Sequence, residues 1–330
     1  MSNDSDRSRF TVPARDVPVP RSLSEGARQA LKLSGEVPRV VLPSADDDQG
    51  WLEVIAGQRA QEAQLVDSGM LDSFLSSTDT DVEARTVDGV PVFVGTPHGL
   101  AQDDLRVVLV IHGGGWTQGR GPLVRLSAAL EASNLGLRTW AVDYRLLPDD
   151  RYPASLDDCV AVYRALVAEV GAENIAVTGT SAGGNLAAAM LLRARGEGLP
   201  APAALGLWTP AVDLTLDGDS WHTNDGLDPV IGQHTRTLVE YYVRGEDPRD
   251  PFLSPIFGDL SQFPPTVLVT GTRDGLLSDT VRFHRELRRS GVDAVLHVFE
   301  GLPHGGFDFV SPEDAERNAE FRAFFHRQLP

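Results

Sequence analysis

Cysteine is nearly absent from the chain, which has one, Cys159, among 330 residues. A single thiol cannot form a disulfide within the chain, and this count fits a reducing compartment. Cys159 lies in a segment that is predicted to be helical, so we expect it to be a small core side chain and not a redox group.

Long apolar runs are absent as well. No window approaches the ~18 consecutive apolar residues that a membrane-spanning helix needs. Residues 1–20 are polar and rich in proline, without the apolar stretch of a signal peptide, and we expect them to be disordered or loosely attached. We therefore expect a soluble, cytoplasmic protein with no membrane insertion.

Positive charge is scarce, because 29 Lys and Arg residues face 47 Asp and Glu residues, for a net charge of −18. No basic stripe is available to neutralise phosphates, so nucleic acid is excluded as a partner. The chain also lacks a His-Glu-x-x-His motif and paired cysteines, which disfavours a metallohydrolase. It has no internal repeat and no low-complexity tract.

The rest of the composition is that of an ordinary globular protein, with 42% hydrophobic and 23% charged residues. The length allows one α/β domain that carries insertions. Residues 22–75 are predicted to be mainly helical. Asp88-Gly89 then separates two short runs, at 83–87 and 90–96, as in a β-hairpin. Pro91 favours an edge position for the second of these strands.

Strands and helices alternate from there to the C-terminus. Strands are predicted at 105–111, 139–142, 175–178, 204–208, 266–270 and 294–299, and helices at 153–170, 183–195, 278–290 and from Ser311 onward, the last with Phe321, Phe324 and Phe325 on one face. This alternation predicts a mostly parallel sheet with helices on both faces. Residues 210–255 are too long for a simple connection and form a predicted, partly helical insertion.

The first chemical motif is Gly-Thr-Ser-Ala-Gly at residues 179–183, between a predicted strand and a predicted helix. A sharp strand–turn–helix elbow exposes the serine hydroxyl, and the flanking glycines remove side chains that would clash in the turn. The alternative is a glycine-rich turn without chemistry. The strand–helix context favours Ser181 as a nucleophile.

The second motif is His-Gly-Gly-Gly at residues 112–115, directly after the strand at 105–111. Glycines let backbone N–H groups approach a substrate and stabilise an oxyanion. The spacing does not match a phosphate-binding loop. The candidate donors are the N–H groups of Gly113, Gly114 and Ala182, and we expect His112 to hold the loop.

The acid and the base of a triad follow later in the chain. Asp274 comes just after a strand end, whereas Asp279 stands at the start of the next helix, where carboxylates commonly act as caps. Of eight histidines, His304 alone lies in a glycine-rich loop past the last strand, Gly-Leu-Pro-His-Gly-Gly. The order Ser181, Asp274, His304 is that of α/β-hydrolases, and each residue follows a strand's carboxyl end.

At these motifs the chain resembles the bacterial hormone-sensitive-lipase-like (family IV) esterases of the α/β-hydrolase fold. The resemblance runs from about Val87 to the C-terminus and includes the segments 143–148 and 152–158. Most members have Asp before the elbow serine, whereas this chain has Thr180, as in the Gly-Thr-Ser-Ala-Gly branch.

The resemblance implies Ser181 as nucleophile, His304 as base and Asp274 as its partner, with the oxyanion donors named above. It implies hydrolysis of short-chain acyl esters, no cofactor, and a helical cap. The cap would comprise residues 1–80 and an insertion at about 210–250, with residues 81–330 as the catalytic domain.

We therefore expect a carboxylesterase that acts on small-molecule esters. Related members of the branch include hydrolases of lactones, so a cyclic ester is an alternative substrate for the same triad. A non-catalytic small-molecule receptor on this fold would be expected to have lost a triad member, and all three are present. We also expect a homodimer, because residues 294–299 form the last strand, and an exposed edge invites pairing with a second copy.

Overall fold

The computed structural model describes residues 12–35, 41–307 and 311–330, and these ranges form an α/β fold around one eight-stranded sheet. The strand order is β1-β2-β4-β3-β5-β6-β7-β8, with β1 and β2 antiparallel to their neighbours and the remaining pairs parallel. The strands are β1 (Thr80–Val87), β2 (Val90–Pro97), β3 (Val107–Ile111), β4 (Arg138–Val142), β5 (Ile175–Thr180), β6 (Ala204–Trp208), β7 (Thr266–Gly271) and β8 (Ala294–Phe299). The predicted mostly parallel sheet is confirmed.

The hairpin at Asp88-Gly89 is also confirmed, with both residues at positive φ (49° and 85°), as a type I′ turn requires. The expectation that its second strand lies at an edge is wrong, because β2 lies between β1 and β4. Pro91 is tolerated because the ladder from β2 to β4 begins only at Val92. Beside the ladder, the Pro91 carbonyl accepts the N–H of Asp143 at 3.0 Å, a bond that needs no donor from proline.

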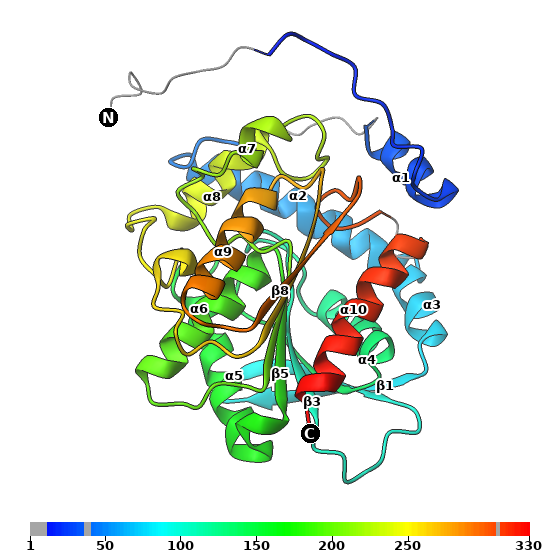
Figure 1. The fold of residues 1–330 in the computed structure, drawn as a ribbon, viewed down its shortest axis with the longest axis vertical. Helices are drawn as coiled ribbons and strands as arrows, with labels where there is room; N and C mark the ends of the chain where they lie inside the picture. Colours follow the sequence, from blue (N-terminus) through cyan, green and yellow to red (C-terminus); the bar gives the residue numbers. More distant parts are fainter. Residues whose placement is uncertain (1–11, 36–40, 308–310) are drawn as a thin grey trace.

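Helices cover both faces of the sheet (Figure 1). One face carries α4 (Pro122–Leu135) and α10 (Pro312–Gln328), and the other carries α5 (Ala154–Val170), α6 (Ala182–Gly196) and α9 (Leu277–Arg289). Helix α4 has no counterpart among the predicted elements, although Pro122 in its first turn and Gly136 at its end are ordinary helix boundaries.

The two faces of the sheet bury separate hydrophobic clusters, which explains the continuous apolar run of β3. Val107, Leu109 and Ile111 point into the cluster beneath α5 and α6, and the alternate residues Val108 and Val110 point into the cluster beneath α4 and α10. The second cluster contains the three phenylalanines predicted to share one face of the last helix, Phe321, Phe324 and Phe325.

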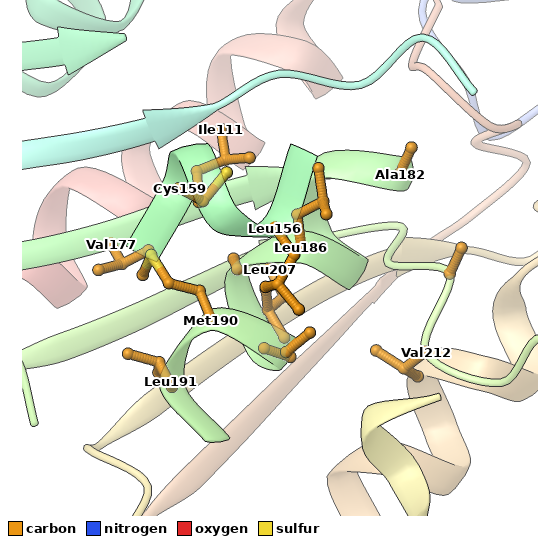
Figure 2. Packing of buried hydrophobic residues seen from close by; sticks show 14 of the residues in the cluster. Ile111, Leu156, Cys159, Val177, Ala182, Leu186, Met190, Leu191, Leu207 and Val212 are labelled. Carbon is orange, nitrogen blue, oxygen red and sulfur yellow. The ribbon is translucent and has the colours of Figure 1, made fainter. Parts of the chain in front are cut away.

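Cys159 lies in the larger cluster, where Figure 2 shows it beside side chains of the sheet and of α6. The residue is fully buried on α5, and burial raises the pKa of its thiol well above the ordinary value. The prediction of a small core side chain is therefore confirmed.

The chain has two further groups of helices. Before β1 come α1 (Glu25–Gly35), α2 (Asp48–Asp67) and α3 (Met70–Ser77), and between β6 and β7 come α7 (Ser220–Thr223), η3 (Gln233–Thr235), α8 (Arg236–Val243) and η4 (Pro255–Phe257). The single turn η2 (Ala172–Asn174) belongs to neither group and directly precedes β5. The groups touch where Trp51 of α2 stacks on Tyr241 of α8, with ring centroids 4.6 Å apart.

The N-terminal prediction can be compared only in part. Residues 1–11 lie outside the described residues, and residues 12–20 contain no helix or strand. No helix in the described part of the chain is long and apolar enough to cross a membrane.

Candidate active site

Ser181 occupies a tight turn between β5 and α6. Its φ of 56° and ψ of −120° are unusual for a residue with a side chain, and they fit the strained elbow that the motif predicts. The flanking glycines are required by space. A Cβ on Gly179 would lie 2.4 Å from the Gly183 carbonyl oxygen, and a Cβ on Gly183 would lie 2.1 Å from that of Ile111.

The structure brings Ser181, His304 and Asp274 together from three separate loops. The His304 Nε2 lies 2.9 Å from the Ser181 Oγ, and its Nδ1 lies 3.1 Å from the Asp274 Oδ1. Asp274 is fully buried and His304 is nearly so. Both distances are those of hydrogen bonds, so a proton can pass from hydroxyl to imidazole beside a fixed carboxylate.

Asp274 is itself held in place. Its Oδ2 accepts the Thr270 hydroxyl at 2.6 Å and its Oδ1 accepts the Leu276 N–H at 2.9 Å. Burial of the His304 ring acts to lower its pKa, but the hydrogen bond and charge of Asp274, with the charge of Asp228, outweigh burial and raise that pKa above its ordinary value.

Asp279 has a different environment from the one predicted. The N-cap of α9 is Leu276, and Asp279 points inward with 1% of its surface exposed. Its Oδ2 accepts the Asp213 N–H at 3.1 Å, and its Oδ1 has no hydrogen-bond partner among the residues that the structure describes. Burial, followed by the nearby charge of Asp213, raises the pKa of Asp279 well above its ordinary value. Asp279 thus lies in the first turn of α9, as expected, but the expectation that it caps the helix is wrong, because its carboxylate binds the loop after β6 instead.

The loop after β3, residues 112–119 and here called the glycine loop, lies against the elbow. A Cβ on Gly113 would be 3.4 Å from the Ser181 Cβ. Among the described residues, the N–H groups of Gly113, Gly114 and Ala182 donate to no protein acceptor. The N–H of Ala182 belongs to the first turn of α6, where helical N–H groups lack intrahelical partners. These three donors are therefore available to a bound oxyanion.

His112 supports this loop through contacts of its ring and its backbone carbonyl. Its Nδ1 donates to the Gly113 carbonyl at 2.7 Å, its ring stacks on Tyr144 at 4.1 Å, and its own carbonyl accepts the Tyr144 hydroxyl at 2.7 Å. Burial lowers the pKa of His112 to about 4, so the ring is neutral at pH 7. These contacts agree with the predicted role of holding the loop.

Helices from both additional groups contact the glycine loop. The Glu62 Oε1 on α2 accepts the Gly119 N–H at 2.9 Å. A Cβ on Gly115 would lie 2.7 Å from the Leu238 side chain on α8. Helices α2 and α8 thus lie next to the loop that contacts the Ser181 elbow.

Sequence reasoning missed two groups that support the triad, Thr270 and Asp228. Thr270 could have been found, because it lies one residue before the end of β7, four residues before Asp274. Asp228 lies in the insertion, where no motif marks it. It forms with Asp274 and His304 a cluster whose potential metal-binding atoms lie within 4.8 Å of one another. These atoms already accept or donate hydrogen bonds within the protein, so the cluster does not fit a resident metal ion.

Comparison with known proteins identifies the class. Residues 108–308, more than half of the chain, match the model of the alpha/beta hydrolase fold. Carboxylesterase NlhH of Mycobacterium tuberculosis is 34% identical over 266 residues, which cover 75% of this chain and 83% of NlhH. The chain therefore belongs to the α/β-hydrolase family, and it is a carboxylic ester hydrolase.

Similar solved structures indicate which group of α/β-hydrolases the chain resembles. The crystal structure of esterase E25 superposes with a TM-score of 0.83 and 32% identity, covering 98% of this chain and 99% of E25. An esterase from the bacterial hormone-sensitive lipase family gives a TM-score of 0.77 and 30% identity, covering 93% and 99%. The structural neighbours are thus esterases of the family that the motifs predict.

Proposed function

We propose that this protein is a carboxylesterase that cleaves short-chain acyl esters through an acyl-serine intermediate, with Ser181 as nucleophile, His304 as base and Asp274 as orienting acid. The observation that carries the proposal is the continuous hydrogen-bonded row from Ser181 through His304 to Asp274, which begins on a strained elbow. A hydroxyl with that geometry can be deprotonated as it attacks.

The reaction follows from this arrangement. The His304 Nε2 takes the hydroxyl proton as the Ser181 Oγ attacks the ester carbonyl carbon, and the N–H groups of Gly113, Gly114 and Ala182 stabilise the oxyanion. His304 then protonates the leaving alcohol, which departs and leaves an acyl-serine. Water, deprotonated by His304, attacks the acyl carbon. The second intermediate then collapses as the bond from the acyl carbon to the Ser181 Oγ breaks and His304 returns the proton to that oxygen, which frees the acid and Ser181.

The variant Ser181→Ala tests the nucleophile. Deletion of a triad serine costs on the order of 10⁶ in turnover, so we expect essentially no ester hydrolysis. Alanine adds no atoms to the turn, and the far-ultraviolet circular dichroism should match that of the wild type. A folded Ser181→Ala protein with near-normal turnover would falsify the assignment.

We propose that residues 1–80 and the insertion at about 210–250 form a cap that limits acyl length. The contacts of Glu62 and Leu238 with the glycine loop support this proposal. An enclosed pocket gains ~0.8 kcal/mol per buried methylene until its far wall is reached. We therefore expect the specificity constant to peak at acyl chains of roughly two to eight carbons and then fall.

A panel of activated esters of increasing acyl length, with several lactones, tests this specificity. A constant that still rises at about twelve carbons, or activation by a lipid–water interface, would indicate a lipase with an open site. Lactones hydrolysed faster than every linear ester would favour the cyclic-ester alternative.

We also propose a homodimer that forms at the β8 edge. Within the described sheet β8 pairs only with β7, so its outer backbone groups face no strand. Val295 and Val298 of this strand are 36% and 45% exposed, which adds apolar surface to the edge.

A further inference from the structure

The segment Ser220–Asp228 of the insertion, here called the clasp, holds the loop that carries Asp274. At its start, the Ser220 Oγ donates to the Gly275 carbonyl at 2.7 Å and accepts the Ser278 N–H at 2.9 Å. A second hydrogen bond joins the same two residues, in which the Ser220 N–H donates to the Ser278 Oγ at 2.9 Å. The clasp is thus tied to the turn that follows the catalytic acid.

In the middle of the clasp, the Asn224 side chain forms hydrogen bonds with the backbone of the same loop. Its Nδ2 donates to the Asp274 carbonyl at 2.8 Å and to the Thr272 carbonyl at 3.2 Å. Asn224 is buried, so neither bond is exchanged for water.

At the C-terminal end of the clasp, Asp228 binds the backbone of the loop that carries the base as well as that of the acid loop. The Asp228 Oδ2 accepts the Gly275 N–H at 2.6 Å and the His304 N–H at 3.2 Å. The Oδ1 accepts the N–H groups of Val230 and Ile231 at 2.8 and 2.9 Å. Asp228 is 1% exposed, so one buried oxygen joins the acid loop to the base loop through their backbones.

Asp228 also acts on His304 through its charge. Two carboxylates act electrostatically on the imidazole, Asp274 from the loop after β7 and Asp228 from the insertion. Four backbone N–H groups satisfy the Asp228 carboxylate, and this favours its ionised form against the burial that raises its pKa. When ionised, Asp228 adds a second negative charge, which stabilises the imidazolium that forms when Ser181 gives up its proton.

We propose that Asp228 is a positioning residue for the ester hydrolysis: it fixes the acid and base loops relative to each other from the insertion, and its charge favours protonated His304. This inference rests on the proposed triad. It assigns the insertion a second role besides enclosing the substrate, because the catalytic geometry would depend on the clasp being docked.

The variant Asp228→Asn separates this role from simple packing. Asparagine keeps the shape but offers one oxygen, so one pair of N–H groups faces an NH₂ group instead of an acceptor. Misplacement of a catalytic group by about 1 Å costs about 10²-fold, and we expect a loss of that order in kcat with little change in KM. Loss of the charge lowers the His304 pKa, so the acid limb of the kcat/KM profile should move to lower pH.

Two other variants serve as controls. Asp250→Asn changes a carboxylate of the same insertion that, within the described ranges, accepts a hydrogen bond only from the nearby Phe252 N–H, and it should leave both kcat and the acid limb unchanged. Asn224→Ala removes clasp bonds without removing charge, so it should lower kcat and leave the acid limb in place.

The outcomes are distinct. Wild-type kcat and an unmoved acid limb in folded Asp228→Asn overturn the inference while the triad stands. If Asp228→Asn does not fold, Asn224→Ala decides, and unchanged kcat in that variant overturns the inference. If Ser181→Ala retains turnover, the proposed function fails first. The inference is supported if kcat falls in both Asp228→Asn and Asn224→Ala while the acid limb shifts only in Asp228→Asn, and if Asp250→Asn changes neither.

Discussion

Replacement of Asp279 by asparagine should make the free energy of unfolding less sensitive to rising pH. Asp279 is buried beside Asp213. One of its oxygens accepts the Asp213 N–H, and the other has no hydrogen-bond partner in the described part of the chain. Its pKa is raised well above the ordinary value by burial and by the neighbouring carboxylate. The folded protein therefore keeps this proton to higher pH than the unfolded chain, which releases it near the ordinary pKa of about 3.9.

The sign of the effect follows from this difference. A group whose pKa is raised by folding contributes stability that is complete below the unfolded pKa and is lost as pH rises through the folded pKa. The loss is at most about 1.4 kcal/mol per pH unit. Asparagine cannot ionise, but its NH₂ group would occupy the site of the unpartnered oxygen, at a cost of about 1 kcal/mol. One pH unit of loss in the wild type is enough to offset that cost.

Urea unfolding of Asp279→Asn and wild type at several values between pH 5 and pH 9 tests this reasoning. The free energy of unfolding of the variant should equal or exceed that of the wild type already near pH 5, because about one pH unit above the unfolded pKa offsets the cost of asparagine. The difference in favour of the variant should then grow with pH until the folded pKa of Asp279 is passed. The exposed Asp293→Asn serves as control and should give a constant difference. Parallel curves for Asp279→Asn would refute the argument that this carboxyl group is protonated in the fold.

Three further predictions follow from residues described above. Asp274→Asn should lower kcat about 10⁴-fold in steady-state ester hydrolysis, because asparagine does not fix the His304 tautomer; a loss no larger than that of Asp279→Asn would contradict the choice of acid. Phe325→Ala empties a fully buried site beneath α10 and should cost about 3–5 kcal/mol in urea unfolding, whereas a cost below about 1 kcal/mol would mean that the site collapses. Light scattering at micromolar concentration should give twice 35.6 kDa, and the single-chain mass would reject pairing at β8.

The parts of the site that sequence predicts best are those whose backbone is constrained. The elbow needs glycine at residues 179 and 183 because any Cβ there would collide with backbone atoms. Such requirements leave a fixed pattern in the sequence, and strand ends then place the patterns at one edge of the sheet. Ser181, Asp274 and His304 could therefore be selected, and the structure brings them within hydrogen-bond distance.

The parts that escaped prediction depend on contacts distant in sequence. Asp228 is 46 residues before Asp274 in a segment without periodicity, and only the docked insertion brings it to the His304 backbone. Asp279 has the sequence context of a cap, but the loop at Asp213 covers it. Pro91 indicated an edge because a proline lacks a donor, yet the ladder to β4 simply begins one residue later.

The buried thiol of Cys159 can serve as a probe of how often the hydrophobic core opens around α5. A reagent that reacts with thiolates can reach this sulfur only when α5 separates from the sheet, since the side chain is fully buried. No other cysteine competes for the reagent. The rate of labelling, followed in the presence and absence of a slowly hydrolysed ester, would therefore report how much an occupied site slows the opening of the core.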